Sequence, residues 1–287
     1  YSVIIDTFDL PFQYDFEHYE LNETGKYQVF FEETQGTALF KQYIWASGNS
    51  GFALTGVGRN PQEYPTVSIE NGIDGSRAIK LETKSTGQFG ETVKMPIAAG
   101  NLFLGSFDVN NAVQKPLKAT LFGLPFGKKP LKFKGYYKYV PGTQSFKAKD
   151  KNGNTVTISR QEDEGDIYAV LYEAAGLDGK VLDGNNVLTS KNIVALARVE
   201  VEKTDRYIEF ETSFQYGERK EISWPQFIYR DPSDDGTGKY LRFSEEKMKN
   251  YEYNLAVVFT SSKYGAYFAG SVGSTLCIDK VEIVCEK

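Results

Sequence analysis

Apolar and polar residues alternate with a period of two along much of the chain, which is the repeat of a β-strand with one buried face. The clearest example is the segment 131–140, in which Phe133, Tyr137 and Tyr139 share one face and lysines occupy most of the other. Residues 167–172 are apolar on both faces, which predicts a central strand that is covered on both sides. The dominant pattern therefore predicts β-strands.

The last strand-like run contains a change of phase. Leu276 and Ile278 lie on one face of an ideal strand, whereas Val281 and Ile283 lie on the other, and the change falls at residues 279–280. A repeat of two cannot change phase without a bulge or a twist. We therefore expect a β-bulge in the closing strand.

The remaining runs predict an all-β protein. Further strands are expected at residues 14–17, 28–31, 43–45, 78–83, 102–107, 117–122, 193–201, 206–216 and 253–260. Residues 247–253 are the segment most similar to a helix and predict a single helical turn. Residues 151–154 predict the tip of a hairpin. This pattern predicts an antiparallel β-sandwich jelly roll with long Gly/Asp-rich loops. We expect one domain over 14–287, preceded by an introductory segment or linker over 1–13.

Composition and charge narrow the function classes. The chain of 287 residues has a net charge of −5, which argues against a nucleic-acid partner. No segment approaches the roughly 18 apolar residues needed to span a membrane. The sequence begins at Tyr1 without a signal peptide, so we expect a mature or trimmed chain whose export signal or anchor would not be visible. Nineteen tyrosines and 20 phenylalanines supply many flat rings.

Metal and nucleophile chemistry find little support. The chain has one histidine, His18, and two cysteines, Cys277 and Cys285. On one strand these cysteines would lie about 26 Å apart, too far for a disulfide. Without a Cys/His cluster a zinc site is not expected, and a Ser-His-Asp or Cys-His enzyme would depend on His18 alone.

One carboxylate pair has a spacing that glycoside hydrolysis could use. Glu209 and Glu211 are two residues apart on one strand face, so their Cα atoms lie roughly 6.5–7 Å apart. Hydrolysis requires two carboxyl groups about 5–5.5 Å apart for retention or about 6.5–9.5 Å apart for inversion. The same pattern also describes an ordinary exposed strand face, so both readings stay open.

Sugar binding requires less chemistry, because it needs aromatic faces under pyranose rings and a few fixed polar groups. Each aromatic candidate could instead be a core or rim residue. The candidate ligand-binding residues are Trp45, Asn49, Tyr137, Lys138, Tyr139, Trp224, Ser262 and Tyr264.

A structural Ca²⁺ is the one cofactor that the sequence suggests. Lectin-like sandwiches hold this ion with carboxylates and carbonyls near their first and last strands. Asp15 and Glu17 in the first strand and Asp279 in the last could converge there. The alternative is that each is a single exposed acid on its strand.

Three longer motifs resemble one bacterial family. They are MPIAAGNLFLGSF at 95–107, FGLPFGKKPLKFKGYYKYVPG at 122–142, and VFTSSKYGAYFAGSVGSTLCIDKVEIV at 258–284. Together they are similar to the "putative carbohydrate metabolism domain" family, from about Tyr14 onward. The chain departs from the expected pattern at Cys277 and Lys280, where an aromatic residue and a second acid would stand, and this weakens the Ca²⁺ hypothesis.

The resemblance implies a jelly roll similar to those of glycoside hydrolases and carbohydrate-binding modules, with a glycan site in the corresponding place. It implies a secreted or cell-surface protein of a Gram-negative, gut-type bacterium, at the outer membrane or in the periplasm. It also implies that an immunoglobulin-like domain often precedes this one. The family has no established reaction.

Residues and resemblance together favour a domain that binds oligo- or polysaccharide and takes part in polysaccharide use without catalysis. One alternative is a glycoside hydrolase that uses a carboxylate pair such as Glu209 and Glu211. The other is a structural or adhesive surface protein without a sugar site.

Overall fold

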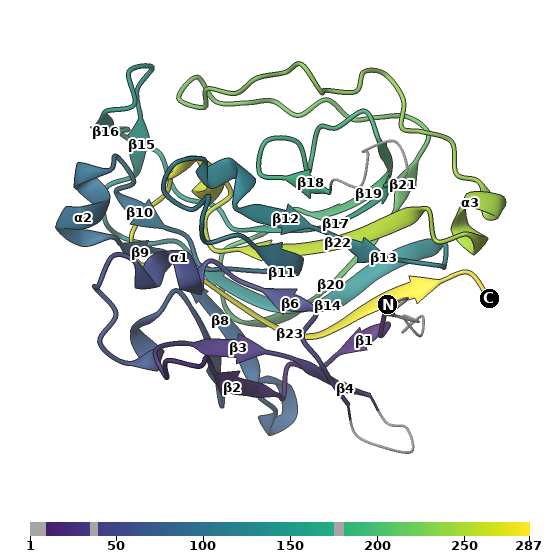
Figure 1. Cartoon of the computed structure of the whole chain (residues 1–287), viewed down its shortest axis with the longest axis horizontal. Helices are drawn as coiled ribbons and strands as arrows, with labels where there is room; N and C mark the ends of the chain where they lie inside the picture. Colours follow the sequence, from purple (N-terminus) through teal and green to yellow (C-terminus); the bar gives the residue numbers. More distant parts are fainter. Residues whose placement is uncertain (1–9, 35–39, 175–180) are drawn as a thin grey trace, which may run out of the picture.

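The computed structural model of the chain describes residues 10–34, 40–174 and 181–287, and its main elements are two antiparallel sheets packed face to face (Figure 1). The six-stranded sheet consists of β20 (Thr204–Ser213), β14 (Pro130–Val140), β23 (Thr275–Cys285), β8 (Ala78–Glu82) and β7 (Thr66–Ile69) in spatial order, with β1 (Gln13–Tyr14) paired to β23. The nine-stranded sheet consists of β18 (Leu182–Asp183), β12 (Thr120–Phe122), β11 (Asn101–Phe107), β22 (Tyr253–Thr260), β17 (Asp166–Glu173), β19 (Ile193–Val199) and β21 (Gln215–Tyr216), with β13 (Leu124–Pro125) on β22 and β6 (Trp45–Ala46) on β11. This confirms the predicted antiparallel β-sandwich jelly roll.

Smaller elements decorate the sandwich. Four two-stranded ribbons pair β2 (Tyr19–Leu21) with β3 (Gln28–Phe30), β4 (Glu32–Thr34) with β5 (Phe40–Gln42), β9 (Lys84–Ser85) with β10 (Ile97–Ala98), and β15 (Lys147–Lys149) with β16 (Thr155–Thr157). Among the described residues, the helices are α1 (Asn49–Ala53), α2 (Gly87–Thr92), α3 (Glu245–Lys249) and the 3-10 turns Pro61–Glu63, Ile73–Gly75, Pro116–Lys118 and Gly265–Tyr267. The predicted hairpin tip at 151–154 joins β15 to β16, and the predicted helical turn appears as α3.

The core between the sheets follows the alternation in the sequence. Phe133, Tyr137 and Tyr139 of β14 are buried there, and so are Ile167, Ala169 and Leu171 of β17. The other face of β17 is also buried, because Tyr168, Val170 and Tyr172 pack in a second core beneath covering loops. The prediction that 167–172 form a central strand covered on both sides is therefore confirmed.

The predicted β-bulge is present in β23. The pairing register with β14 shifts between Lys134 and Tyr136, opposite Asp279–Glu282, and Lys280 adopts a positive φ of 46°. The bulge returns Val281 and Ile283 to the inner face, where they join Leu276 and Ile278 in the core. The bulge thus compensates for the change of phase in the apolar pattern, so that β23 has one continuous buried face.

Some strand boundaries differ from those expected. The strand predicted at 14–17 ends after Tyr14, because Phe16 takes a left-handed backbone conformation with φ 58°. Of the run 117–122 only 120–122 is a strand, since Pro116–Lys118 forms a 3-10 turn. Within the introductory segment predicted over 1–13, residues 1–9 lie outside the described residues, whereas Leu10 packs in the core and Gln13 pairs with Glu282.

Candidate functional site

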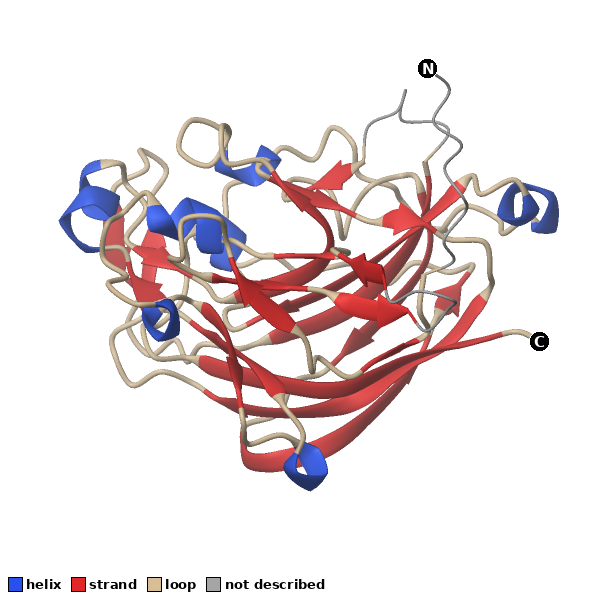
Figure 2. Ribbon diagram, turned by 60° about the horizontal axis from the view of Figure 1, so that its bottom comes forward, coloured by secondary structure: helices blue, strands red, loops and turns tan. Residues whose placement is uncertain are grey.

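A cleft lies on the outer face of the nine-stranded sheet, between the sheet and the loops that cover it. Its volume is about 190 Å³. Strands β11, β12, β17 and β22 contribute to its wall, as do α1, α2, the 3-10 turns at 116–118 and 265–267, and the loop 184–189. Figure 2 shows the long strands of the sandwich bowed beneath several of these helices and loops. Much of the same sheet face is filled by the second core, so the cleft is what the covering loops leave open.

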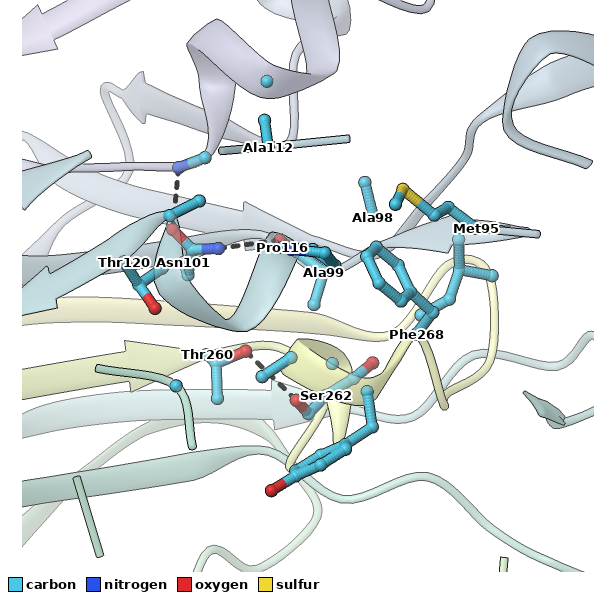
Figure 3. A pocket seen from close by; sticks show the side chains of 18 of the residues that line it. Met95, Ala98, Ala99, Asn101, Ala112, Pro116, Thr120, Thr260, Ser262 and Phe268 are labelled. Carbon is cyan, nitrogen blue, oxygen red and sulfur yellow. Dashed lines mark hydrogen bonds between the residues drawn. The ribbon is translucent and has the colours of Figure 1, made fainter. Parts of the chain in front are cut away.

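The cleft has an apolar end and a more polar end. Figure 3 shows Met95, Ala98 and Phe268 gathered at one end, and Asn101 and Thr120 at the other. Phe89 of α2 also lines the cleft and is 41% exposed, so apolar surface continues to its rim. Such a site can bury an apolar group and hold it against a few polar contacts.

Asp166 and Arg198 form a bidentate ion pair on this face of the sheet. Arg198 Nε donates to Asp166 Oδ1 at 2.9 Å, and Nη2 donates to Oδ2 at 2.6 Å. The Asp166 side chain is 3% exposed, and Asp166 also lines the cleft. Burial raises the pKa of the neighbouring Tyr168 hydroxyl, with the Asp166 charge adding to the effect, so Tyr168 stays protonated. Among the described residues Asp166 is the one carboxylate in the wall of the cleft.

An aromatic cluster stands beside the ion pair. The Trp224 ring lies 6.0 Å from Tyr267 and 6.3 Å from Tyr264, and the Arg230 guanidinium lies 4.8 Å above Trp224. Arg230 is fixed in turn by two hydrogen bonds to Asp235 and one to Thr189 at 2.9 Å. Trp224 and Tyr267 line the cleft and are half-buried, so parts of both rings can contact a ligand.

The floor near Ser262 is held by a buried carboxylate. Asp163 Oδ2 accepts hydrogen bonds from Ser262 Oγ, Ser274 Oγ and the Ser271 amide at 2.6–2.7 Å. Burial raises the pKa of Asp163, and these hydrogen bonds oppose the shift. The network ties together segments 99 to 111 residues apart in the sequence and gives this part of the wall a fixed shape.

Four predicted ligand-binding residues lie in the interior instead. Trp45 is 4% exposed and packs between the sheets, where its Nε1 donates to Glu32 at 2.7 Å. Asn49 is fully buried and bonds the backbone of Thr66. Tyr137 and Tyr139, each 2% exposed, belong to the same inter-sheet core. The three rings offer no free face to a sugar because packing already covers them, and both ends of the Asn49 amide are bonded to the backbone, so we leave all four out of the candidate site.

The other four predicted residues divide between two sides of the molecule. Trp224, Ser262 and Tyr264 lie at or beside the cleft. Lys138 lies on the outer face of the six-stranded sheet, with its ammonium 4.9 Å from the Tyr207 ring. The structure therefore brings only the first three together.

The carboxylate pair of the hydrolase hypothesis also lies on the six-stranded sheet. Glu209 and Glu211 are both exposed. Glu211 bonds the ammonium groups of Lys132 and Lys134, and these contacts lower its pKa. A carboxyl held ionised by two lysines is a poor proton donor.

The predicted cation ligands are each engaged with protein donors. Asp279 is fully buried and accepts from the Ile73 amide, Ser76 Oγ and the Lys280 amide. Glu17 accepts from the Arg77 amide, and Asp15 from the Glu17 amide. Within the described parts of the chain, no three His, Cys, Asp or Glu side chains are grouped so that they could hold a metal ion. The three acids are therefore not assembled as a site.

A second, more open cleft of about 690 Å³ lies where the first strands meet β14 and β23. Asp15, Glu32, Glu33 and Glu209 line it together with Tyr136. Burial raises the pKa of Glu32 to about 7, the Trp45 hydrogen bond lowers it, and the Asp15 charge raises it further. Burial therefore places the pKa of this carboxyl near neutral pH.

Sequence reasoning missed several residues of the first cleft. Asp166 and Arg198 are single charges next to strand-like apolar runs, and Arg230 stands in an irregular loop. Met95 and Phe268 look like ordinary core residues in the sequence. One signal was available in the sequence: a charged residue stands at the end of a run that is apolar on both faces. Such a charge is expected to be buried, and a buried charge requires a partner.

Comparison with known proteins places the chain in a family. Residues 15–284 match the "putative carbohydrate metabolism domain", and the chain belongs to this family. A protein from Bacteroides thetaiotaomicron described as a "putative glycoside hydrolase" is 41% identical in sequence; the match covers 98% of this chain and 72% of that one, with a TM-score of 0.79. A protein from Bacteroides vulgatus with the same description is 35% identical over 97% of this chain and 99% of that one, with a TM-score of 0.75. No functionally curated protein matches the chain. Among the described residues, no helix is long and apolar enough to cross a membrane.

Proposed function

We propose that this domain binds an oligo- or polysaccharide at the cleft on the nine-stranded sheet and does not cleave it there. The observation that carries the proposal is the half-buried Trp224–Tyr267 pair at the cleft, fixed by Arg230 beside the buried Asp166–Arg198 ion pair. Rings held in this way can stack on the C–H face of a sugar at little entropic cost. Hydrolysis would require a second carboxyl group across the bond, and Asp166 is the one carboxylate among the described residues of the wall.

A glycan array followed by calorimetry tests this proposal. We expect Trp224→Ala to weaken binding of any glycan hit by about 5-fold to 150-fold, because burying and stacking the ring contributes about 1–3 kcal/mol. The matched control is Tyr43→Ala, which removes a ring that is 50% exposed and does not line the cleft. Binding that is absent throughout, or equal in both variants, would contradict the proposal.

A second function, glycoside hydrolysis, is favoured by the other cleft. Its support is the Glu32 carboxyl with a pKa of about 7 near Asp15, together with the description given to the two Bacteroides relatives. Paired carboxyl groups with separated proton affinities are the usual acid and nucleophile or base of such enzymes. Reducing-sugar release that disappears in Glu32→Gln but persists in Glu211→Gln would favour this function over binding alone.

A further inference from the structure

The polar side chains in the wall of the first cleft are largely occupied by the protein itself. Asn101 Oδ1 accepts from the Gly48 amide at 2.8 Å and its Nδ2 donates to the Ala99 carbonyl at 3.2 Å, while Thr260 Oγ1 donates to the Ser262 carbonyl at 3.1 Å (Figure 3). The others with protein partners are Thr55, Thr86, Asp166, Asn185, Thr189, Ser262 and Lys263. Part of the hydrogen-bonding capacity of these groups is therefore already used within the protein.

Thr120 differs from these groups. Its Oγ1 is buried and has no hydrogen-bond partner among the described residues. A hydroxyl in this position can donate to one acceptor, such as a carbonyl oxygen. A ligand that placed one acceptor near Thr120 would supply the missing bond.

The opposite end of the cleft suits an apolar group. Met95, Ala98 and Phe268 lie there (Figure 3), and Phe89 extends the apolar wall to the rim. The volume of about 190 Å³ compares with the 150 Å³ or so of an apolar cavity that holds benzene. A bare pyranose seated here would bury hydroxyls without partners, which is unfavourable. An acyl or aroyl group would not.

From these observations we infer that the cleft recognises a saccharide carrying an O-acyl or O-aroyl ester. The sugar lies at Trp224 and Tyr267 with one of its oxygens near Thr120 at the polar end, and the ester, carbonyl and apolar part together, enters the opposite end lined by Met95, Ala98 and Phe268. The inference rests on the proposed function, because the same site must bind the sugar. It restricts the ligand to acylated glycans of the kind found in plant cell walls and in other modified polysaccharides.

The test compares matched ligands. An array of acetylated and feruloylated oligosaccharides is probed beside the same oligosaccharides after mild saponification, and hits are titrated by calorimetry. Each buried methylene is worth about fourfold in affinity, so an ester of a few carbons should strengthen binding by tenfold or more. Free acetate and ferulate are included as separate ligands.

Two variants locate the effect. Ala98→Leu fills the apolar end, so it should abolish the preference for the acylated ligand over the saponified one. Phe268→Ala removes one wall and should reduce the preference several-fold. Thermal melting checks that both variants are folded, and Tyr43→Ala should change neither affinity.

The outcomes separate the two proposals. Equal binding of acylated and saponified ligands, or a preference that survives Ala98→Leu in a folded protein, would overturn the inference and leave glycan binding standing. Binding of free ferulate as tight as that of its saccharide ester would show that the sugar contributes nothing and would overturn both. Absence of binding across the whole array would also count against both.

Discussion

The buried Glu32 carboxyl should make the stability of the protein depend on pH in an unusual direction. Glu32 is 6% exposed and bonds Trp45 Nε1 at 2.7 Å, and its pKa rises from 4.5 to about 7 on folding, mainly because burial disfavours the charged form. Below pH 4.5 the carboxyl is protonated in both the folded and the unfolded chain, and no stability is lost. As the pH rises from 4.5 to about 7, the unfolded chain releases the proton while the folded protein retains it. Stability therefore falls across this window and is level above it.

The magnitude follows from the two pKa values. Their difference corresponds to about 3 kcal/mol of unfolding free energy lost by pH 8. Glu32→Gln removes the ionisable group and keeps a side-chain oxygen that can accept from Trp45. We therefore expect Glu32→Gln to be more stable than the wild type by about 3 kcal/mol at pH 8 and by little at pH 4.5. At roughly 2 °C per kcal/mol in a domain of this size, the melting temperature should rise by about 6 °C at pH 8.

Urea denaturation of both proteins between pH 4 and 8.5 measures the effect, and calorimetric melting checks it. The matched control is Glu33→Gln, which neutralises the neighbouring and exposed carboxyl and should shift stability by less than about 0.5 kcal/mol at any pH. A stability difference between Glu32→Gln and wild type that is the same at pH 4.5 and pH 8 would refute the reasoning, because it would show that Glu32 titrates alike in both states.

Three further changes test the packing around the first cleft. Gly105→Ala should lower the free energy of unfolding, measured in urea, by about 3 kcal/mol or more, because a Cβ at its φ of 139° would stand 2.0 Å from the Leu121 carbonyl oxygen. The control is Gly25→Ala, which has open space around it and should cost about 1 kcal/mol. Asp163→Asn should cost roughly 2–4 kcal/mol, because the Asn oxygen can replace only one carboxylate oxygen: with it at the Oδ2 position, where three donors meet, the NH2 group would face the Glu164 amide that now bonds Oδ1; a loss below 1 kcal/mol would contradict this assignment. Arg198→Met should cost about 3 kcal/mol by leaving Asp166 buried and unpaired, and adding Asp166→Asn should recover most of that loss; strict additivity of the two changes would exclude the coupling.

Much of the fold could be predicted because alternation reports burial directly. The two-sided apolar run at 167–172 identified a central strand, and the change of phase near Asp279 identified the bulge that Lys280 forms. The early end of the first strand could not be predicted, because the left-handed conformation of Phe16 depends on contacts made after folding.

Fewer residues of the candidate site than of the fold could be predicted from the sequence. An aromatic residue has the same sequence signature in a core and at a binding surface, so Trp45 and Trp224 could not be told apart, although one is buried against Glu32 and the other lines the cleft. The pairing of Asp166 with Arg198 joins residues 32 positions apart across neighbouring strands. Such a pair follows from strand register, which local patterns leave open.

The pairing of β1 with β23 has a mechanical consequence. Gln13 pairs with Glu282 in antiparallel register, and the Ile283 amide donates to the Phe12 carbonyl. The start of β1 therefore lies beside the end of β23. Tension applied between the two ends would therefore peel β1 away one hydrogen bond at a time, instead of loading all of its bonds together in shear. Under force the domain should yield first at this edge, at low force, with the rest of the sandwich still intact.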